Sequence, residues 1–246
     1  LLRLFNRYGF EYVGFPYFGW LLAIQTAVVK IAKDLDINLV FYGEDGELEY
    51  GGKSRTKDNP IFNINYMKEI YTENHYEKIK KKIRNKEKYN FSFFKFENKD
   101  AKKLKNIQLT HWSSFENWDP YRNYVTAKKY CNLSESNTNN LGTFTNFAQN
   151  DQALVALHTY MMFVKFGFGR ATADACIEVR RGAMNRNQAL NLVKLYDGKY
   201  PLEFEKVYLE YYNLSKKKFH QIIDKHANKK ILKKNGNQWE LIKDVN

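Results

Sequence analysis

Apolar positions recur with a helical period at the start of the chain. On residues 1–13 they fall on one face, and a Gly-Phe-Pro break follows. The same period predicts a helix over residues 20–35. Residues 39–42 form a short β-branched and aromatic run, which predicts a buried strand. A helix, a loop and a buried strand in this order are typical of an α/β unit.

The rest of the chain is predicted to be mainly helical. A second strand is expected at 107–112, before a helix over 121–130 that Asp119 caps. After a polar stretch at 132–140 the pattern is helical throughout. The expected helices cover 151–166, 170–181 with Gly182 as its C-terminal glycine, and 186–196 with Asn185 and Gln188 as a capping box, and two more begin at Pro201 and Ser215.

These elements predict two domains. Residues 1–131 are expected to be the C-terminal part of an α/β domain. Within it, residues 60–88 are predicted to be helical but irregular, residues 89–105 are charged and aromatic with no clear period, and 72–106 is a divergent helical and charged region. Residues 132–246 are expected to form a helical C-terminal domain. Because the chain begins inside a helical pattern and without Met, we expect that an upstream portion precedes it.

Composition narrows the class of protein. The longest apolar stretch, 18–29, is too short to span a membrane and contains Gln25 and Thr26, and no secretory signal is visible. Two cysteines among 246 residues fit a reducing compartment, so a cytoplasmic protein is expected. The net charge of +13 has three readings: a solvated lysine-rich face, a phosphate-rich small substrate or a polynucleotide.

An acidic, glycine-punctuated loop follows the first predicted strand. In open α/β sheets the ligand crevice lies beyond the carboxyl ends of the strands. Gly43 lets the backbone approach a ligand, and Glu44 and Asp45 are suited to hold Mg²⁺ or to pair with a cationic group. The alternative is a solvated acidic turn without a ligand.

A second candidate site lies at the break between two predicted helices. Gly167 and Gly169 leave backbone N–H groups available, and Arg170 at the helix start adds a two-point anion donor. The alternative is a helix–helix corner in which the glycines permit close packing. His158 is either a packed histidine or a base. Trp118 either precedes a capped helix or stacks on a sugar ring.

Several segments, taken in order, resemble one family. They are YGEDGELEYGG at 42–52, WDPY at 118–121, GTFTNF at 142–147 with Asp151, His158 with Tyr160, FGFGRAT at 166–172, RRG at 180–182 and YDG at 196–198. The family is the N-acetyl sugar amidotransferases of lipopolysaccharide and pseudaminic-acid pathways. The resemblance implies an α/β fold: the C-terminal portion of a Rossmann-like PP-loop ATPase sheet, followed by a helical C-terminal domain.

The resemblance also implies a reaction. ATP would adenylate the oxygen of an acetamido group, Mg²⁺ would neutralise the departing pyrophosphate, and ammonia would replace the activated oxygen to leave an acetamidino group. The PP-loop and the N-terminal Cys-x-x-Cys pairs of the family are absent from this chain. We therefore expect that the chain alone does not turn over ATP and that a structural zinc belongs only to an upstream part.

By resemblance, Glu44 and Asp45 would be catalytic and would hold Mg²⁺. The implied nucleotide- or substrate-binding residues are Gly43, Glu49, Tyr50, Gly51, Gly52, Trp118, Asp119, His158, Lys165, Gly167, Gly169 and Arg170. The implied partners are an acetamido sugar, free or nucleotide-activated, and a glutaminase subunit or free ammonia. No membrane partner and no nucleic acid is expected. The alternatives are a tRNA-modifying PP-loop enzyme and a non-catalytic helical adaptor.

Overall fold

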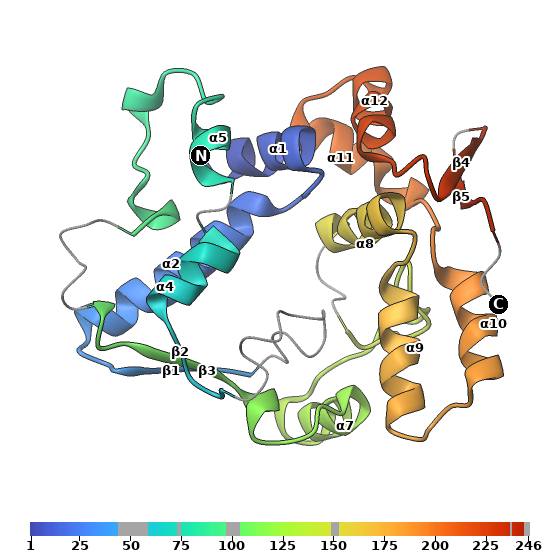
Figure 1. Cartoon of the computed structure of the whole chain (residues 1–246), viewed down its shortest axis with the longest axis horizontal. Helices are drawn as coiled ribbons and strands as arrows, with labels where there is room; N and C mark the ends of the chain where they lie inside the picture. Colours follow the sequence, from blue (N-terminus) through green and yellow to red (C-terminus); the bar gives the residue numbers. More distant parts are fainter. Residues whose placement is uncertain (44–58, 73–74, 97–103, 149–152, 237, 244–246) are drawn as a thin grey trace. The chain divides into compact units, whose positions relative to one another are not determined.

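The computed structural model describes residues 1–43, 59–72, 75–96, 104–148, 153–236 and 238–243 (Figure 1). The chain forms two compact units: Leu1–Val13 with Tyr17–Trp118, and Gly14–Pro16 with Asp119–Asn246. The units divide after Trp118, whereas the predicted domains divide after residue 131, because the helix at 120–131 belongs to the second unit. The described structure is mixed α/β and mostly helical, with small sheets.

The first unit begins with two long helices, which a small sheet follows. Helix α1 (Leu2–Val13) packs against α2 (Phe18–Asp34), as the periodicity predicted. The Asn6 side chain accepts hydrogen bonds from the backbone N–H groups of Gly19 (2.8 Å) and Trp20 (3.1 Å). These groups lie in the first turn of α2, where a helix has no internal partner for them. Asn6 therefore joins the two helices.

The sheet follows α2. Strands β1 (Leu39–Tyr42) and β3 (Gln108–His111) confirm the two predicted strands, and β2 (Phe62–Asn63) completes the order β1-β3-β2. β1 pairs parallel with β3, and β2 pairs antiparallel with it. A parallel pair needs a long connection, here residues 43–107. No described feature reproduces the PP-loop part of the predicted fold.

The prediction of a buried first strand was wrong. Val40 packs with Leu109 and with Val29 of α2, but Leu39 and Phe41 on the opposite face are exposed. Among the described residues only one face of β1 is covered, so alternation along the strand decides burial.

Short irregular helices lie between β2 and β3, as the pattern of 60–88 predicted. They are α4 (Ile64–Met67), the π-helix η2 (Lys68–Thr72), α5 (Tyr76–Lys80) and the 3₁₀-helix η3 (Lys86–Lys88). The 3₁₀-helix η4 (Ser92–Phe94) comes after them, and η6 (Trp112–Ser114) follows β3.

The second unit is helical up to residue 226. Its elements are α7 (Pro120–Cys131), α8 (Ala153–Phe166), α9 (Arg170–Arg180), α10 (Arg186–Tyr196), η7 (Leu202–Phe204), α11 (Glu205–Tyr212) and α12 (Lys216–His226). The capping box of Asn185 and Gln188 and the cap of Ser215 are present as predicted. None of the described helices combines the length and the apolar character that a membrane crossing requires.

The end of the chain departs from the prediction of helix throughout. Strands β4 (Leu232–Asn235) and β5 (Gln238–Leu241) form an antiparallel hairpin. Leu232 and Trp239 are its buried side chains, and Gly236 between the strands has a positive φ of 59°. Four-residue strands show too few alternations for a period of two to stand out in the sequence.

Candidate functional site

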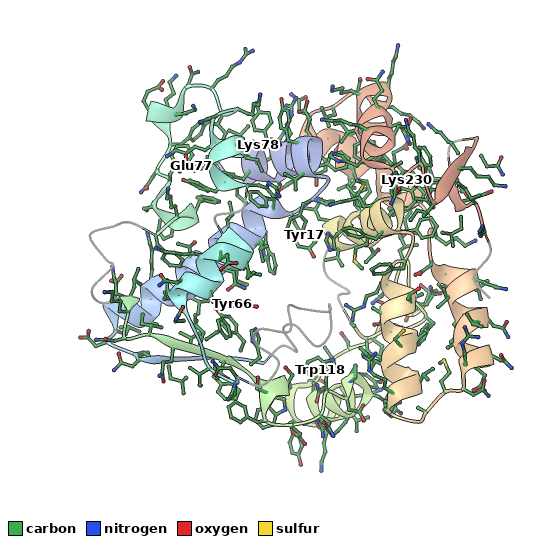
Figure 2. The ribbon with its side chains drawn as sticks, viewed as in Figure 1. Tyr17, Tyr66, Glu77, Lys78, Trp118 and Lys230 are labelled. Carbon is green, nitrogen blue, oxygen red and sulfur yellow. The ribbon has the colours of Figure 1, made fainter. Side chains whose placement is uncertain are left out.

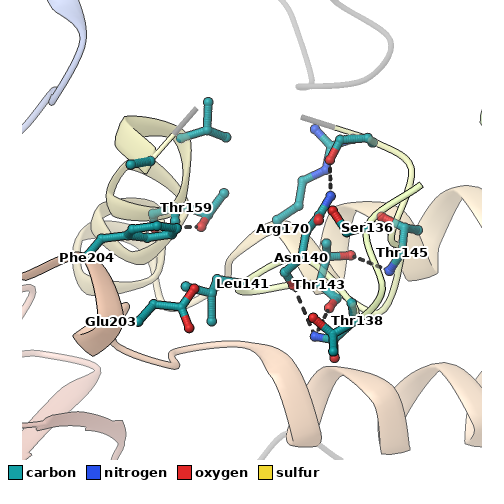
Figure 3. A pocket seen from close by; sticks show the side chains of 15 residues that line it. Ser136, Thr138, Asn140, Leu141, Thr143, Thr145, Thr159, Arg170, Glu203 and Phe204 are labelled. Carbon is teal, nitrogen blue, oxygen red and sulfur yellow. Dashed lines mark hydrogen bonds between the residues drawn. The ribbon is translucent and has the colours of Figure 1, made fainter. Parts of the chain in front are cut away.

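A polar cavity of about 330 Å³ lies within the second unit. Its wall is formed by the loop that precedes α8, the first turns of α8, the start of α9, and η7 (Figure 3). The lining residues are Ser136, Thr138, Asn139, Asn140, Leu141, Thr143, Thr145, Ala148, Ala153, Val155, Ala156, Thr159, Arg170, Glu203 and Phe204. Most of the side-chain functional groups that face it are therefore hydroxyls and amides rather than charges.

Arg170 is the cationic residue of this lining, and it is held by a buried carboxylate. Its Nε donates to Oδ1 of Asp174 at 2.8 Å, and the two residues are 9% and 6% exposed. The Thr143 hydroxyl donates to the other oxygen of Asp174 at 2.5 Å. Burial raises the pKa of Asp174, and the Arg170 charge and these hydrogen bonds oppose that rise. The pair fixes the guanidinium at the cavity wall.

The loop of residues 136–148 is folded by its own hydrogen bonds. The backbone N–H groups of Ser136 and Asn140 donate to the carbonyls of Asn146 (2.8 Å) and Thr145 (2.7 Å). Gly142, with a φ of 78°, accepts a hydrogen bond at its carbonyl from the N–H of Ala171 (2.9 Å), so the loop is tied to α9. These bonds give the cavity a defined polar wall.

The opposite wall is different in character. Figure 3 shows Phe204 and Glu203 across the cavity from Thr138 and Thr145. The hydroxyl oxygen of Thr145 is buried and has no hydrogen-bond partner among the described residues. The cavity thus offers an aromatic face and a carboxylate to a ligand.

The start of α9 is already occupied by a carboxylate of the chain itself. Asp197 accepts hydrogen bonds from the N–H of Gly169 (2.9 Å) and from the hydroxyl of Thr172 (2.5 Å). Burial raises the pKa of Asp197, and these hydrogen bonds oppose the rise. Of the two N–H groups that the sequence assigned to a phosphate or sugar carboxylate, that of Gly169 is therefore bonded to Asp197, and that of Gly167 donates to the carbonyl of Phe163 (2.8 Å).

The two glycines of this corner have packing roles. A Cβ on Gly167 would lie 2.8 Å from Cδ1 of Ile231, and one on Gly169 would lie 2.9 Å from Oδ1 of Asp197. Gly167 also has a φ of 79°, a conformation that favours glycine. These observations favour the alternative of a close-packed corner at both glycines, while Arg170 still lines the cavity.

His158 and Lys165 lie on α8 but are not among the lining residues of the cavity. The His158 ring packs on Phe15, with 5.0 Å between ring centres. Burial, reinforced by the charges of Lys165 and Arg170, lowers the pKa of His158 to about 4. Burial also lowers the pKa of Lys165. His158 is therefore neutral at neutral pH, and its packing fits the packed-histidine alternative.

Trp118, labelled in Figure 2, directly precedes Asp119, the N-terminal cap residue of α7. Asp119 caps this helix by accepting from the N–H of Arg122 (3.0 Å), as predicted. The other carboxylate oxygen of Asp119, Oδ2, is 3.5 Å from Nη1 of Arg181, which is the C-terminal cap residue of α9. Asp119 therefore also joins two helices. The indole N–H of Trp118 is buried without a hydrogen-bond partner among the described residues. Neither residue lines the cavity.

The predicted nucleotide side of the site lies in the first unit. Tyr42 and His111 are register partners at the carboxyl ends of the parallel strands β1 and β3, and their rings stack at 5.2 Å. Gly43 follows as an exposed bend. The residues Glu44, Asp45, Glu49, Tyr50, Gly51 and Gly52 lie outside the described residues. Within the described ranges, no group of three His, Cys, Asp or Glu side chains could hold a metal ion.

The structure also assigns residues that the candidate site did not include. Asn140, Thr143 and Asp197 fall in or beside segments that carry the family resemblance, which was the available signal. Asp174 stands four residues after Arg170, a spacing that permits an ion pair on one helix face. Glu203 had no signal in the sequence, because only the folding of η7 against the loop brings it to the cavity.

Comparison with known proteins bears on this same part of the chain. No match was found among curated proteins. Residues 141–246 match the family model described as "LPS biosynthesis protein WbpG-like, C-terminal domain". The matched range includes α8, α9, Arg170, Glu203 and the terminal hairpin. The C-terminal part of this chain is therefore similar to the C-terminal domain of a family of LPS-biosynthesis proteins, which suggests a biosynthetic enzyme.

Proposed function

We propose that this chain is part of an ATP-dependent amidotransferase of surface-glycan biosynthesis and that its polar cavity binds the acetamido sugar. The observation that carries the proposal is a cavity lined by hydroxyls, amides and one fixed guanidinium, built largely from residues that match an LPS-biosynthesis family. The reaction itself rests on the family resemblance of the ordered segments 42–52, 118–121, 142–147 and 166–172.

The lining chemistry suits a neutral sugar. Sugar hydroxyls and an acetamido group both donate and accept hydrogen bonds, as do the side chains of Ser136, Thr138 and Asn139. Phe204 offers an apolar ring face to the C–H side of a pyranose. Because Asp174 neutralises Arg170, the guanidinium serves as a directed hydrogen-bond donor and adds little net attraction for an anion.

The nucleotide is proposed to bind at the carboxyl ends of β1 and β3. ATP would supply the adenylyl group that activates the acetamido oxygen, and Glu44 and Asp45 have the oxygen ligands that Mg²⁺ prefers. Ammonia would arrive free or from a glutaminase partner. The residues of this chain would orient the sugar, and the loop 136–148 would hold its acetamido side against the wall.

Sugar binding tests the proposal. In the complete enzyme, Arg170→Lys keeps the charge but loses the planar fork, so affinity for an acetamido sugar should fall about ten- to a hundred-fold, with ATP affinity nearly unchanged. Thr138→Val should also weaken sugar binding, with little effect on stability because Thr138 is exposed. Arg181→Lys, on the same helix but away from the cavity, is the matched control.

Calorimetric titration with a panel of acetamido sugars and, separately, with ATP gives the answer. Unchanged sugar affinity in both Arg170→Lys and Thr138→Val would show that this cavity does not bind the sugar. An equal loss of ATP affinity would mean that Arg170 does not act on the sugar selectively.

The acidic loop requires its own test. Glu44→Gln or Asp45→Asn in the complete enzyme should lower turnover about a hundred-fold, which corresponds to roughly 3 kcal/mol of transition-state stabilisation. The free energy of unfolding should change by about 0.5 kcal/mol or less, because the proposal gives these carboxylates a role in catalysis and none in folding. Pyrophosphate release measures turnover. Wild-type rates in both variants would return this loop to the alternative of a solvated turn.

A further inference from the structure

An exposed apolar cluster lies where the α8–α9 corner meets the terminal hairpin. Phe166 and Phe168 are exposed, the former by 53%, and their rings stack at 6.0 Å. Gly167 between them packs on Ile231, and the carbonyl of Ile231 accepts a hydrogen bond from the N–H of Ile242 (3.0 Å). Ile242 is itself 50% exposed. Four large apolar side chains from three chain segments thus share one exposed surface.

Four lysines adjoin this cluster along the chain. Lys229 and Lys230 directly precede Ile231, Lys233 follows it in β4, and Lys243 follows Ile242, and all four are exposed (Lys230 is labelled in Figure 2). Within the part of the chain that the structure describes, no ion pair involves these four lysines. Their ammonium groups are therefore not held in ion pairs, although Glu240 stands opposite Lys233 in the hairpin register.

We propose that this surface, made of Phe166, Phe168, Ile231 and Ile242 with Lys229, Lys230, Lys233 and Lys243, binds the face of an anionic lipid bilayer. Each half of the surface matches one layer of the bilayer. Aromatic and aliphatic side chains bury apolar area at the boundary between headgroups and acyl chains. Lysines around them meet the negative headgroups, where each adds to the attraction.

The combination of features selects a bilayer over other anionic partners. A polynucleotide would use the lysines and aromatic rings but would leave Ile231 and Ile242 in water. A solvated lysine face would not need a cluster of four exposed large apolar residues at its centre. The expectation of no membrane partner rested on the absence of a spanning segment, and a surface contact needs no span.

The lysine half is tested with the full chain. Binding is measured by co-sedimentation with vesicles of phosphatidylcholine alone and of phosphatidylcholine with an equal share of phosphatidylglycerol. Each lysine near an anionic bilayer strengthens binding about fivefold, so replacement of Lys229, Lys230 and Lys233 by Gln should weaken binding to the anionic vesicles about a hundred-fold. Neutral vesicles should bind weakly in all cases.

A charge-matched control separates this surface from net charge. Lys78, Lys81 and Lys88 are exposed lysines of the first unit, and their replacement by Gln removes the same three charges. It should leave vesicle binding within about threefold of the wild type. An equal loss in both triple variants would overturn the proposal, because binding would then report only the charge of the whole chain.

The contribution of the apolar residues is measured separately, as vesicle binding at high salt. High salt screens the lysines, so the binding that remains should depend on apolar burial. The double variant Phe166→Gln/Ile242→Gln should lose this remainder, whereas Leu35→Gln, at an exposed apolar residue elsewhere, should keep it. Absence of binding to anionic vesicles, or tighter binding to a short RNA duplex that is lost with the same lysines, would refute the bilayer assignment.

Discussion

The buried pair of Arg170 and Asp174 allows the sharpest test of the described structure. Both residues are nearly inaccessible, and a hydrogen bond of 2.8 Å joins them. Removing one partner of a buried pair leaves a charge without compensation and costs about 3–5 kcal/mol. We therefore expect that Asp174→Leu lowers the free energy of unfolding at pH 7 by about 3–5 kcal/mol, because the Arg170 guanidinium cannot lose its proton.

Arg170→Met should behave differently with pH. Burial raises the pKa of Asp174, and the variant lacks the positive charge that opposes this rise. Because the folded-state pKa then lies above the unfolded one, the carboxyl contributes stability below its ordinary pKa and loses it as pH rises. The variant should therefore regain stability as pH falls from 7 toward 4, whereas Asp174→Leu should not.

The double variant Arg170→Met/Asp174→Leu completes the cycle. Apolar side chains of similar volume often replace a buried ion pair at little cost, so the double variant should be more stable than either single one. Its free energy of unfolding should still lie about 1 kcal/mol below that of the wild type, because the Thr143 hydroxyl loses its acceptor. Urea unfolding followed by circular dichroism measures all three. Single variants within about 1 kcal/mol of the wild type, or a double variant with the summed loss, would contradict a buried pair.

Two further predictions concern α8 and the corner after it. Since the folded-state pKa of His158 is about 4, below its ordinary value of 6.5, its contribution to stability is present above pH 6.5 and is lost as pH falls to 4. Urea unfolding at a series of pH values should show a loss of up to about 3 kcal/mol in the wild type that His158→Phe lacks, and equal pH slopes would refute it. Gly167→Ala should lower the melting temperature more than Gly182→Ala, because both glycines have positive φ but only Gly167 faces Ile231; equal shifts would show that backbone strain alone acts.

Local sequence signals predicted the elements well where they were strong. The periodic runs predicted α2 and α9 within about two residues at each end, and the caps at Asn185 and Ser215 placed two helix starts. These features depend on residues three or four positions apart, and the sequence displays that spacing directly. The resemblance of the C-terminal segments to glycan-biosynthesis enzymes likewise agrees with the family matched by residues 141–246.

Only the tertiary structure showed which partner binds the groups that the local sequence pattern marked as a candidate site. The two glycines and the N–H groups before α9 have the pattern of an anion site, yet Asp197, 28 residues beyond Gly169, occupies it. A carboxylate and a ligand phosphate satisfy such N–H groups equally well, so the pattern alone cannot tell them apart.

Local sequence patterns likewise could not predict which side chains of β1 are buried or which residues line the cavity. Residues 39–42 are apolar or aromatic at every position, so only the packing of α2 shows that Val40 is inside and Phe41 outside. The sequence by itself determined the strands β1 and β3, most of the longer helices and the polar character of the segment before α8. Only the folded chain determined that Glu203 faces this segment and that Asp174 neutralises Arg170, because both contacts depend on long-range packing that no local spacing encodes.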